Sequence, residues 1–420
     1  MTSEKTTDDV LIVGGGLAGL SLAASLGHAG LRVAVADRDA PATQLDEAFD
    51  GRTTAIAFGS QRLLTEIGVW SRLEADAEPI REIRVADGGS SLFLHFDHRE
   101  VAPITGNAAP FGWIVENRRL RRALFERCAE LPKVTHLAPM AVEDHAVEGE
   151  TVTARLADGS TRRARLLVGA DGRTSPTRER AGIATIGWPY RQTAIVCVAG
   201  HEKPHNGIAV EHFLAPGPFA ILPMTDAPDG THRSSIVWTE RPETVEPLLA
   251  ADQATFDAEL QRRFGPHLGA VRTLGRRFSY PLSLLQARRF TAPRLALVGE
   301  AAHAIHPIAG QGLNLGMRDI AALAELIVDH ARLGLDIGSP ALLQDYARRR
   351  RVDALALSAA TDVLDRLFSN DIPPIAAARR IGLAAVGQVP SLKRFFMRYA
   401  MGQRAGAGLD LPRLVRGEKL

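Results

Sequence analysis

Cysteine is scarce in this chain of 420 residues, where Cys128 and Cys197 stand alone without a CxxC pair. So small a number argues against a disulfide framework, a zinc site or a thiol redox centre, and predicts that both cysteines are small buried hydrophobes. The chain also lacks an excess of charge, because 50 Lys and Arg residues face 48 Asp and Glu residues. This balance is ordinary for a globular protein and indicates no nucleic-acid partner.

Long apolar segments are missing as well. The polar, acidic start MTSEKTTDD is unlike a secretory signal, so we expect a cytoplasmic protein. Residues 10–30 come nearest to a membrane span, but their clustered glycines suit a tight turn better. No internal repeat is visible. The length predicts two domains, or one core with a large insertion.

A glycine-rich turn near the N-terminus is the first strong signal. The apolar run Val10–Val13 predicts a strand, GGGLAG supplies the spacing GxGxxG, and a predicted helix follows. In such a unit Gly14 permits the tight turn, Gly16 lets the backbone approach a pyrophosphate, and Gly19 lets the helix pack on the strand. Asp37 ends the next predicted strand, where an acceptor for a ribose hydroxyl is expected. The unit predicts a dinucleotide site.

A second strand and turn follow further along the chain. Residues 165–169 predict a buried strand that runs into Asp171-Gly172, a turn with a carboxylate where open α/β sheets gather ligand contacts. Position alone leaves FAD and NAD both open as the dinucleotide. Arg38 beside Asp37 would suit NADP, although an acid at the strand end disfavours its 2′-phosphate.

A third strand, residues 295–298, leads into the segment GEAAHAIHPIAGQGLNLG. Its His303 and His306, with Glu300, are candidate metal ligands. The strand-to-loop context and the lack of a fourth ligand argue against a metal. The other interpretations are histidines that pack near a cofactor, or histidines that contact substrate or relay a proton.

Together these motifs resemble those of the flavin-dependent aromatic hydroxylases, the single-component monooxygenases like para-hydroxybenzoate hydroxylase. The fingerprints of that family are GxGxxG, DG, and GD followed by a proline-glycine loop. The chain is similar above all to the ubiquinone-biosynthesis hydroxylase branch, and the similarity covers nearly the whole length. It is carried by DGRTTAIA at 50–57, ENR at 116–118, AAHAIHPIAGQGLNLGMRD at 301–319, ATD at 360–362 and LFS at 367–369.

The resemblance implies FAD as the cofactor and NAD(P)H as a transient co-substrate. Arg52 and Arg118 match family arginines near the flavin and pyrophosphate, whereas Glu300 stands where the family usually has Asp, which puts its contact with the ribitol chain in doubt. The flavin ring would face a catalytic loop with Pro307, Gly310 and Gly312, without an assigned protein acid or base. The residues implied at FAD are Gly14, Gly16, Gly19, Asp37, Arg52, Arg118, Asp171, Gly172, Gly299, Glu300, Gly312, Leu313 and Asn314.

The implied activity is that of an FAD-dependent monooxygenase. It would use NAD(P)H and O2, through a flavin hydroperoxide, to hydroxylate the ring of a polyprenylated phenol in ubiquinone biosynthesis. One alternative is a related FAD oxidoreductase without oxygen insertion, such as a prenyl reductase. Another is a non-enzymatic prenyl carrier on the same scaffold.

The expected fold is α/β, with a Rossmann-like FAD-binding domain, an inserted mixed or antiparallel β-sheet domain for the substrate and a helical C-terminal region. The FAD-binding domain comprises residues 1–77, 100–189 and 285–345, the substrate domain residues 78–99 and 190–284, and the helical region residues 346–420. Strands are expected at 193–199, 208–214, 219–224 and 234–238. The pocket-wall candidates are Phe213, Phe219, Leu222 and Trp238.

The C-terminal region is basic, with nine Lys or Arg residues and two acids from Pro373 to Leu420. Apolar residues alternate there with cations, which favours a helix that docks on a membrane surface or on other ubiquinone-synthesis proteins; a solvated helical face is the alternative. The location is then cytoplasmic, with peripheral contact at the inner face of the membrane. The cations concerned are Arg379, Arg380, Lys393, Arg394 and Arg398.

Overall fold

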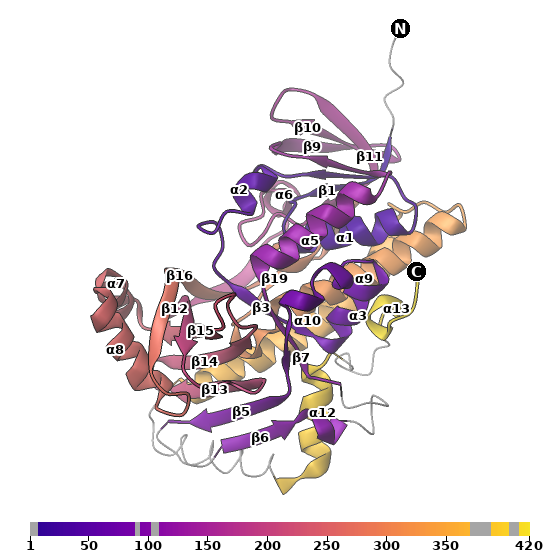
Figure 1. Ribbon diagram of the computed structural model, residues 1–420. Helices are drawn as coiled ribbons and strands as arrows, with labels where there is room; N and C mark the ends of the chain where they lie inside the picture. The colour runs from indigo at the N-terminus through magenta and orange to yellow at the C-terminus, as the bar shows by residue number, and fades with distance from the viewer. Residues whose placement is uncertain (1–6, 89–92, 102–108, 370–387, 403–410) are drawn as a thin grey trace.

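The structure, a computed structural model, describes residues 7–88, 93–101, 109–369, 388–402 and 411–420 (Figure 1). Two eight-stranded sheets dominate it, and a third sheet of three strands, in the order β3-β7-β4, lies beside them. The third sheet comprises β3 (Thr53–Ala57), β7 (Gly112–Glu116) and β4 (Glu78–Ile80). This is the α/β architecture expected from the sequence.

The first sheet has a parallel core in the order β18-β11-β1-β2-β8. Val10, Leu11 and Ile12 of β1 are fully buried, as an apolar strand covered on both faces should be. Because β1 has β2 on one side and β11 on the other, the strand order reverses there and opens a crevice at the carboxyl ends. The strands are β1 (Asp8–Val13), β2 (Val33–Ala36), β8 (Val134–Leu137), β9 (Val142–Glu148), β10 (Thr151–Leu156), β11 (Thr161–Gly169), β17 (Thr291–Ala292) and β18 (Leu295–Leu297).

Helices pack against this sheet. Helix α1 (Leu17–His28) begins directly after the glycine turn, stops before Gly30, whose φ is +90°, and lies between α5 (Asn117–Glu130) and α9 (Gln311–Arg332). Helix α10 (Pro340–Phe368) packs on α9 and reaches the second sheet (Figure 1). The remaining helices are α2 (Pro41–Gln44), α3 (Phe58–Glu66), α6 (Pro176–Arg180), α7 (Pro242–Ala250), α8 (Gln253–Phe264), α12 (Pro390–Ala400) and α13 (Arg413–Arg416).

The second sheet has the order β19-β16-β12-β15-β14-β13-β5-β6, and all its pairs are antiparallel except β13 with β5. The predicted strands are confirmed: β13 has the predicted bounds, and β12, β14 and β15 contain the predicted ranges. The strands are β5 (Glu82–Asp87), β6 (Phe93–Asp97), β12 (Thr185–His201), β13 (Ile208–Leu214), β14 (Gly217–Met224), β15 (His232–Glu240), β16 (Val271–Ala287) and β19 (His303–Ala304).

The two faces of the second sheet have different neighbours. The outer face packs against α7 and α8, which lie at the left of Figure 1, and includes Ile195, Cys197, Phe219, Ile221, Ile236 and Trp238. The inner face turns toward the third sheet and the loop that follows β19. It includes Val196, Val198, Ala209, Glu211, Phe213, Ala220, Leu222, Ser235 and Val237.

This division corrects two of the predicted pocket walls. Phe219 and Trp238 lie on the outer face, where both are 1% exposed and Trp238 packs against Phe256 of α8. Alternation along β14 and β15 turns them away from the inner face, so they belong to a sealed core. Phe213 and Leu222 do lie on the inner face.

Of the predicted cations near the C-terminus, Arg379 and Arg380 lie outside the described residues.

Candidate active site

The glycine turn between β1 and α1 lies at the carboxyl end of the first sheet. Gly14 has a φ of +104°, and a Cβ atom there would lie 2.5 Å from the carbonyl oxygen of Ala170. A Cβ atom on Gly19 would lie 1.8 Å from the carbonyl oxygen of Gly14, so neither position accepts a side chain. Gly16 differs, because nothing lies within 4 Å of its ideal Cβ position. It borders open space beside the N–H groups of α1, which no side chain caps.

Asp37 is buried directly after β2, at the position predicted for a ribose acceptor. Its carboxylate accepts hydrogen bonds from the backbone N–H groups of Gly15 and Asp39, the latter over 2.8 Å. The side chain therefore fastens the glycine turn to β2. A carboxylate offers about four acceptor positions, so some remain for a ribose hydroxyl.

The Asp171-Gly172 turn lies against the glycine turn. The Asp171 carboxylate accepts hydrogen bonds from the backbone N–H of Thr177, over 2.9 Å, and from the hydroxyl of Ser175. Gly172 has a φ of +83° and open space around its Cβ position. The Asp171 side chain thus orders its own turn, and the backbone at Gly172 borders the crevice.

Arg52 lies beside the second sheet. Its guanidinium donates paired hydrogen bonds of 2.8 and 3.0 Å to Asp50 and lies 5.0 Å from the ring centroid of Tyr280 on β16. Burial raises the pKa of Asp50, but the hydrogen bonds and charge of Arg52, with the Asn117 amide, outweigh burial and bring that pKa to about 2. Both groups are therefore charged at neutral pH, and Arg52 keeps 46% of its side chain exposed.

Arg118 begins the first turn of α5 and lies near the surface. It forms a 2.7 Å ion pair with Glu47, whose side chain is 79% exposed. A pair this exposed contributes little to stability, about 0–1 kcal/mol. The contact of Arg118 with a cofactor stays a prediction.

Gly299 and Glu300 follow β18 and lead into the loop that the sequence singles out. Gly299 has a φ of +60°, and its N–H donates to Asp319 of α9 over 3.1 Å. Glu300 is half exposed, and its nearest cation is Arg173, with 3.9 Å between the guanidinium nitrogen and the carboxylate oxygen. At that distance Arg173 does not fix the carboxylate, so Glu300 is free to turn toward a ligand.

The loop from Pro307 to Gly312 lies against β3. Gly310 adopts the left-handed conformation, with a φ of +60°, and its Cβ position is 3.0 Å from the Cβ atom of Ala55. Gly312 borders open space, and the start of α9 has no side-chain cap. N–H groups at this helix start are therefore available to an anion. We call residues 307–312 the flavin loop, after the cofactor that the resemblance implies.

The side chain of Asn314 is occupied by contacts within the protein. Its side-chain oxygen accepts hydrogen bonds from the Ala57 N–H and the Ser60 hydroxyl, and its amide nitrogen donates to the carbonyl oxygens of Ala55 and Gly310. All four positions of the amide are occupied by protein, so this side chain ties α9 to β3 and is not open to a cofactor. A contact between Asn314 and FAD would have to use its backbone.

His303 belongs to a buried polar network. Its Nε2 atom lies 2.6 Å from Oδ2 of Asp319, whose other oxygen accepts a 2.8 Å hydrogen bond from Arg350 of α10. Arg350 and Arg318 both bond Asp353. His303 thus joins β19 to α9 and α10. No group of three or more His, Cys, Asp and Glu side chains gathers as a metal site within the described ranges.

His306 is fully buried beside a bulge in β12. The pairing of β12 with β16 shifts register between Pro189 and Thr193, where Arg191 has a φ of +54°, and this turns Tyr190 and Gln192 toward His306. The His306 Nε2 atom lies 3.2 Å from Oε1 of Gln192. Burial lowers the pKa of His306 to about 4 despite two nearby aspartates, so the ring is neutral at pH 7.

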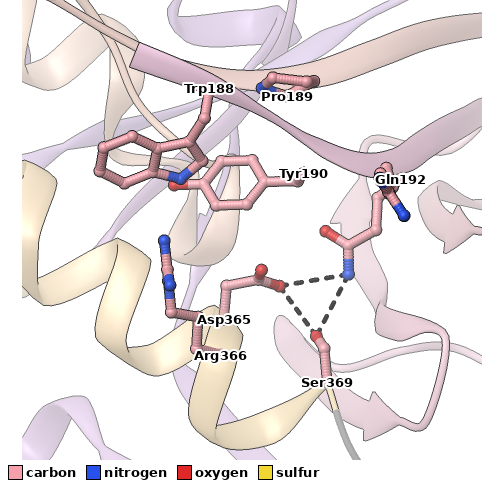
Figure 2. A pocket seen from close by; sticks show the side chains of 8 residues that line it. Trp188, Pro189, Tyr190, Gln192, Asp365, Arg366 and Ser369 are labelled. Carbon is pink, nitrogen blue, oxygen red and sulfur yellow. Dashed lines mark hydrogen bonds between the residues drawn. The ribbon is translucent and has the colours of Figure 1, made fainter. Parts of the chain in front are cut away.

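Figure 2 shows the cavity of about 370 Å³ on the other side of this bulge. The Gln192 amide donates to Asp365, over 3.3 Å, and to Ser369, over 3.2 Å, while the rings of Trp188 and Tyr190 form the opposite wall. These hydrogen bonds anchor the end of α10 to the strand that supports His306. We assign the cluster a supporting role for the flavin loop.

The site residues predicted from the sequence do not include one acidic residue on the second sheet. Glu211 lies in the middle of β13, between Ala209 and Phe213 on the inner face. The available signal was period-2 alternation, which places residues 209, 211 and 213 on one face.

Comparison with known proteins identifies the family. A family model described as an FAD binding domain matches residues 7–361. The ubiquinone hydroxylase UbiL of Rhodospirillum rubrum is 53% identical over 98% of this chain and 93% of its own length. The 3-demethoxyubiquinol 3-hydroxylase of Escherichia coli is 33% identical over 96% of this chain and 100% of its own length.

Solved structures share the fold at lower identity. The p-nitrophenol 4-monooxygenase PnpA from Pseudomonas putida DLL-E4 superposes with a TM-score of 0.77 at 20% identity, covering 94% of this chain and 98% of that one. Klebsiella pneumoniae HpxO, solved as a single-residue variant in complex with FAD, has a TM-score of 0.73 at 18% identity, covering 96% and 100%. With three motifs in place and similarity over nearly its full length, the chain belongs to the family of FAD-dependent ubiquinone hydroxylases.

Proposed function

We propose that this protein hydroxylates the aromatic ring of a polyprenylated phenol in ubiquinone biosynthesis, with NAD(P)H and O2 as co-substrates. The observation that carries the proposal is that the flavin loop and the inner face of the second sheet meet. Ile308 of the loop packs with Phe213 of β13, and Gly310 packs on Ala55 of β3. A substrate ring bound at this junction would lie beside a flavin held by the loop. The names of the relatives point to the same chemistry.

The residues present fit FAD. The open space at Gly16 and the uncapped start of α1 suit a pyrophosphate, and Arg52 supplies a charge that is partly exposed. When bound, FAD accepts hydride from NAD(P)H and activates O2. The nicotinamide donor is proposed to bind transiently, since the sequence contains only one GxGxxG unit of this kind.

The chain's own residues have three tasks in this scheme. The uncapped N–H groups at the start of α9 would stabilise a negative charge on a flavin bound at the loop. This gain is about 0.3–1 kcal/mol for an exposed charge and up to about 2 kcal/mol for a partly buried one. Pro307 and Gly310 set the shape of the flavin loop. The apolar inner face, with Val198 and Leu222, excludes water from the ring.

A polyprenyl substrate lies in a membrane, so we propose that α12 docks the protein at that surface. Lys393 binds Glu100, whereas Arg394 and Phe395 are exposed and Met397 is buried. An exposed cation beside an exposed aromatic ring suits an anionic lipid surface. No helix in the described part of the chain is long and apolar enough to cross a bilayer.

We also propose that residues 78–99 and 190–284 form the domain that binds the substrate.

Assays with the purified protein separate the candidate functions. We expect a yellow protein whose oxidation of NAD(P)H is accelerated by 2-prenylphenol, with a product that has gained one oxygen atom. A product with a reduced prenyl chain would instead establish a reductase, and a colourless protein that FAD cannot reconstitute would favour the carrier. Mass spectrometry of the quinone precursors in a deletion strain identifies the ring position.

Gly16→Val tests the FAD cradle. The valine side chain would enter the open space that we assign to the pyrophosphate, and it meets no protein atom within 4 Å of its Cβ. The variant should therefore fold normally, as judged by circular dichroism and thermal unfolding, and yet bind no FAD. A folded variant that retains FAD would mean that the pyrophosphate lies elsewhere.

A further inference from the structure

Glu211 is an acid in an apolar row. Across the inner face it pairs with Val85 of β5 and Ala220 of β14. The row continues through Val237 of β15 and Val196 of β12. Residues at paired positions point to the same face of a sheet, so aliphatic side chains flank this carboxyl on both sides.

Glu211 forms no hydrogen bond and no ion pair with the residues that the structure describes. Three other shielded acids have cationic partners: Asp50 binds Arg52, Asp319 binds Arg350, and Glu240 binds Arg263. An acid held inside the protein without a partner is costly to a fold, and such a group in a hollow is a sign of a ligand site. The residue keeps intermediate exposure, so a ligand can reach it. Burial alone raises the pKa of Glu211 from its usual 4.5 to about 7.

The position of Glu211 relative to the flavin loop follows from its neighbours. Phe213, two residues along the same face, contacts Ile308 of the loop. Val85, the strand partner of Glu211, packs against both Phe213 and the cluster that contains Ala55. On the far side of the inner face, the Thr53 hydroxyl donates to Ser235 over 2.7 Å. The carboxyl therefore lies on the face of the sheet that these contacts border, beside the flavin loop.

We propose that Glu211 is the catalytic base for the phenol hydroxyl of the substrate. Its carboxylate accepts the O–H hydrogen bond and takes the proton as oxygen is transferred to the ring. The phenol O–H bond breaks, its electron pair stays on the phenol oxygen and enriches the ring, and a new O–H bond forms on the carboxyl. The oxidant is O2 and the reductant NAD(P)H, so the inference rests on the proposed function. A hydrocarbon tail cannot form a hydrogen bond with a carboxylate, whereas a phenol hydroxyl can.

The experiment compares two probes on the FAD-loaded protein, 2-prenylphenol and its methyl ether, which lacks the O–H group. Binding is measured from the change in flavin absorbance, without turnover. The unaltered protein should bind the phenol at least about tenfold more tightly, as expected for a hydrogen bond to a charged group. In Glu211→Leu this ratio should fall to about one. Glu246→Gln is the matched control, since Glu246 is exposed on α7 across the outer face of the same sheet.

Glu211→Gln separates binding from proton transfer. The amide still accepts a hydrogen bond but takes no proton, so kcat should fall about 10²- to 10⁴-fold while KM changes little. The pH profile of kcat/KM should show an ionisation near 7 in the unaltered protein and lose it in the variant. Among the described residues, charged or titratable groups on this side include Asp87 on β5, Arg233 on β15, Tyr280 on β16 with the Arg52–Asp50 pair beside it, Lys393 over Phe96 of β6, and His306 next to the loop, with none on β14. The pKa of His306, about 4, is well separated from that of Glu211.

The outcomes distinguish this inference from the proposed function. If the unaltered protein hydroxylates the phenol, and Glu211→Leu keeps the preference for phenol over ether, Glu211 does not hold the hydroxyl. A Glu211→Gln variant with normal kcat and an unchanged pH profile would also contradict the proposal that Glu211 is the catalytic base. If the unaltered protein makes no hydroxylated product, the proposed function fails, and the binding ratio still decides whether Glu211 recognises a phenol. FAD content and thermal unfolding verify that each variant is folded.

Discussion

The two faces of the second sheet come from the same strands and serve opposite purposes. On the outer face, Phe219, Ile221 and Trp238 fit against Phe256 and Leu260 of α8 in a closed apolar core. On the inner face, Ala220 and Val237 alternate with them and flank the unpaired Glu211. One face is complete without a ligand, and the other is not. The sheet is stabilised by the core on its outer face, whereas the inner face is the one proposed to bind the substrate.

Trp238→Ala should give the largest loss of unfolding free energy, and it should disturb the packing of the outer face alone. Removing a fully buried tryptophan side chain costs about 3–5 kcal/mol of unfolding free energy. Chemical denaturation of the variant measures this loss, while the KM for 2-prenylphenol of the folded fraction should stay unchanged. Trp188→Ala is the control, because Trp188 is 37% exposed, and should cost about 1 kcal/mol at most. A large change in KM for Trp238→Ala would contradict the division of the faces.

Glu211→Gln, on the inner face, should raise the free energy of unfolding where Trp238→Ala lowers it. The folded-state pKa of about 7 lies above the usual 4.5, so the folded protein binds more protons between these values and loses stability as pH rises through that window. At pH 8 the amide should therefore raise the free energy of unfolding by up to about 3 kcal/mol, and at pH 4 by almost nothing. Denaturation at both pH values measures the difference. An equal effect at both would exclude an ionised Glu211 shielded from water.

Ser235→Ala should give the smallest effect. The variant loses the 2.7 Å hydrogen bond from Thr53, which ties the inner face to β3, at a cost of about 1 kcal/mol. A double-mutant cycle with Thr53→Ala isolates the pair, and the two changes together should cost little more than either alone. Additive losses of unfolding free energy would show that the two hydroxyls do not interact.

Local motifs could be read from the sequence, and contacts between distant segments could not. GxGxxG is a property of one turn, so the roles of Gly14 and Gly19 followed from spacing, and the strand signal of β13 gave its bounds. The face of β14 could not be assigned, because Phe219, Ala220 and Ile221 are all apolar and a sheet covered on both faces shows no alternation. Three of the four hydrogen bonds of Asn314 reach β3 and α3, more than 250 residues earlier in the chain, which no local pattern indicates.

The pairing of β19 with β16 makes the segment before the flavin loop an edge strand of the second sheet. Ala304 pairs with Leu285 and His303 with Gln286, while Gly299, a few residues earlier, is held to α9 by Asp319. Backbone pairing thus holds the segment to the second sheet, and Asp319 of α9 holds it at both Gly299 and His303. The segment that leads into the flavin loop is therefore attached both to the sheet proposed to bind the substrate and to the helix that begins at the loop, so the two proposed sites share one structural support.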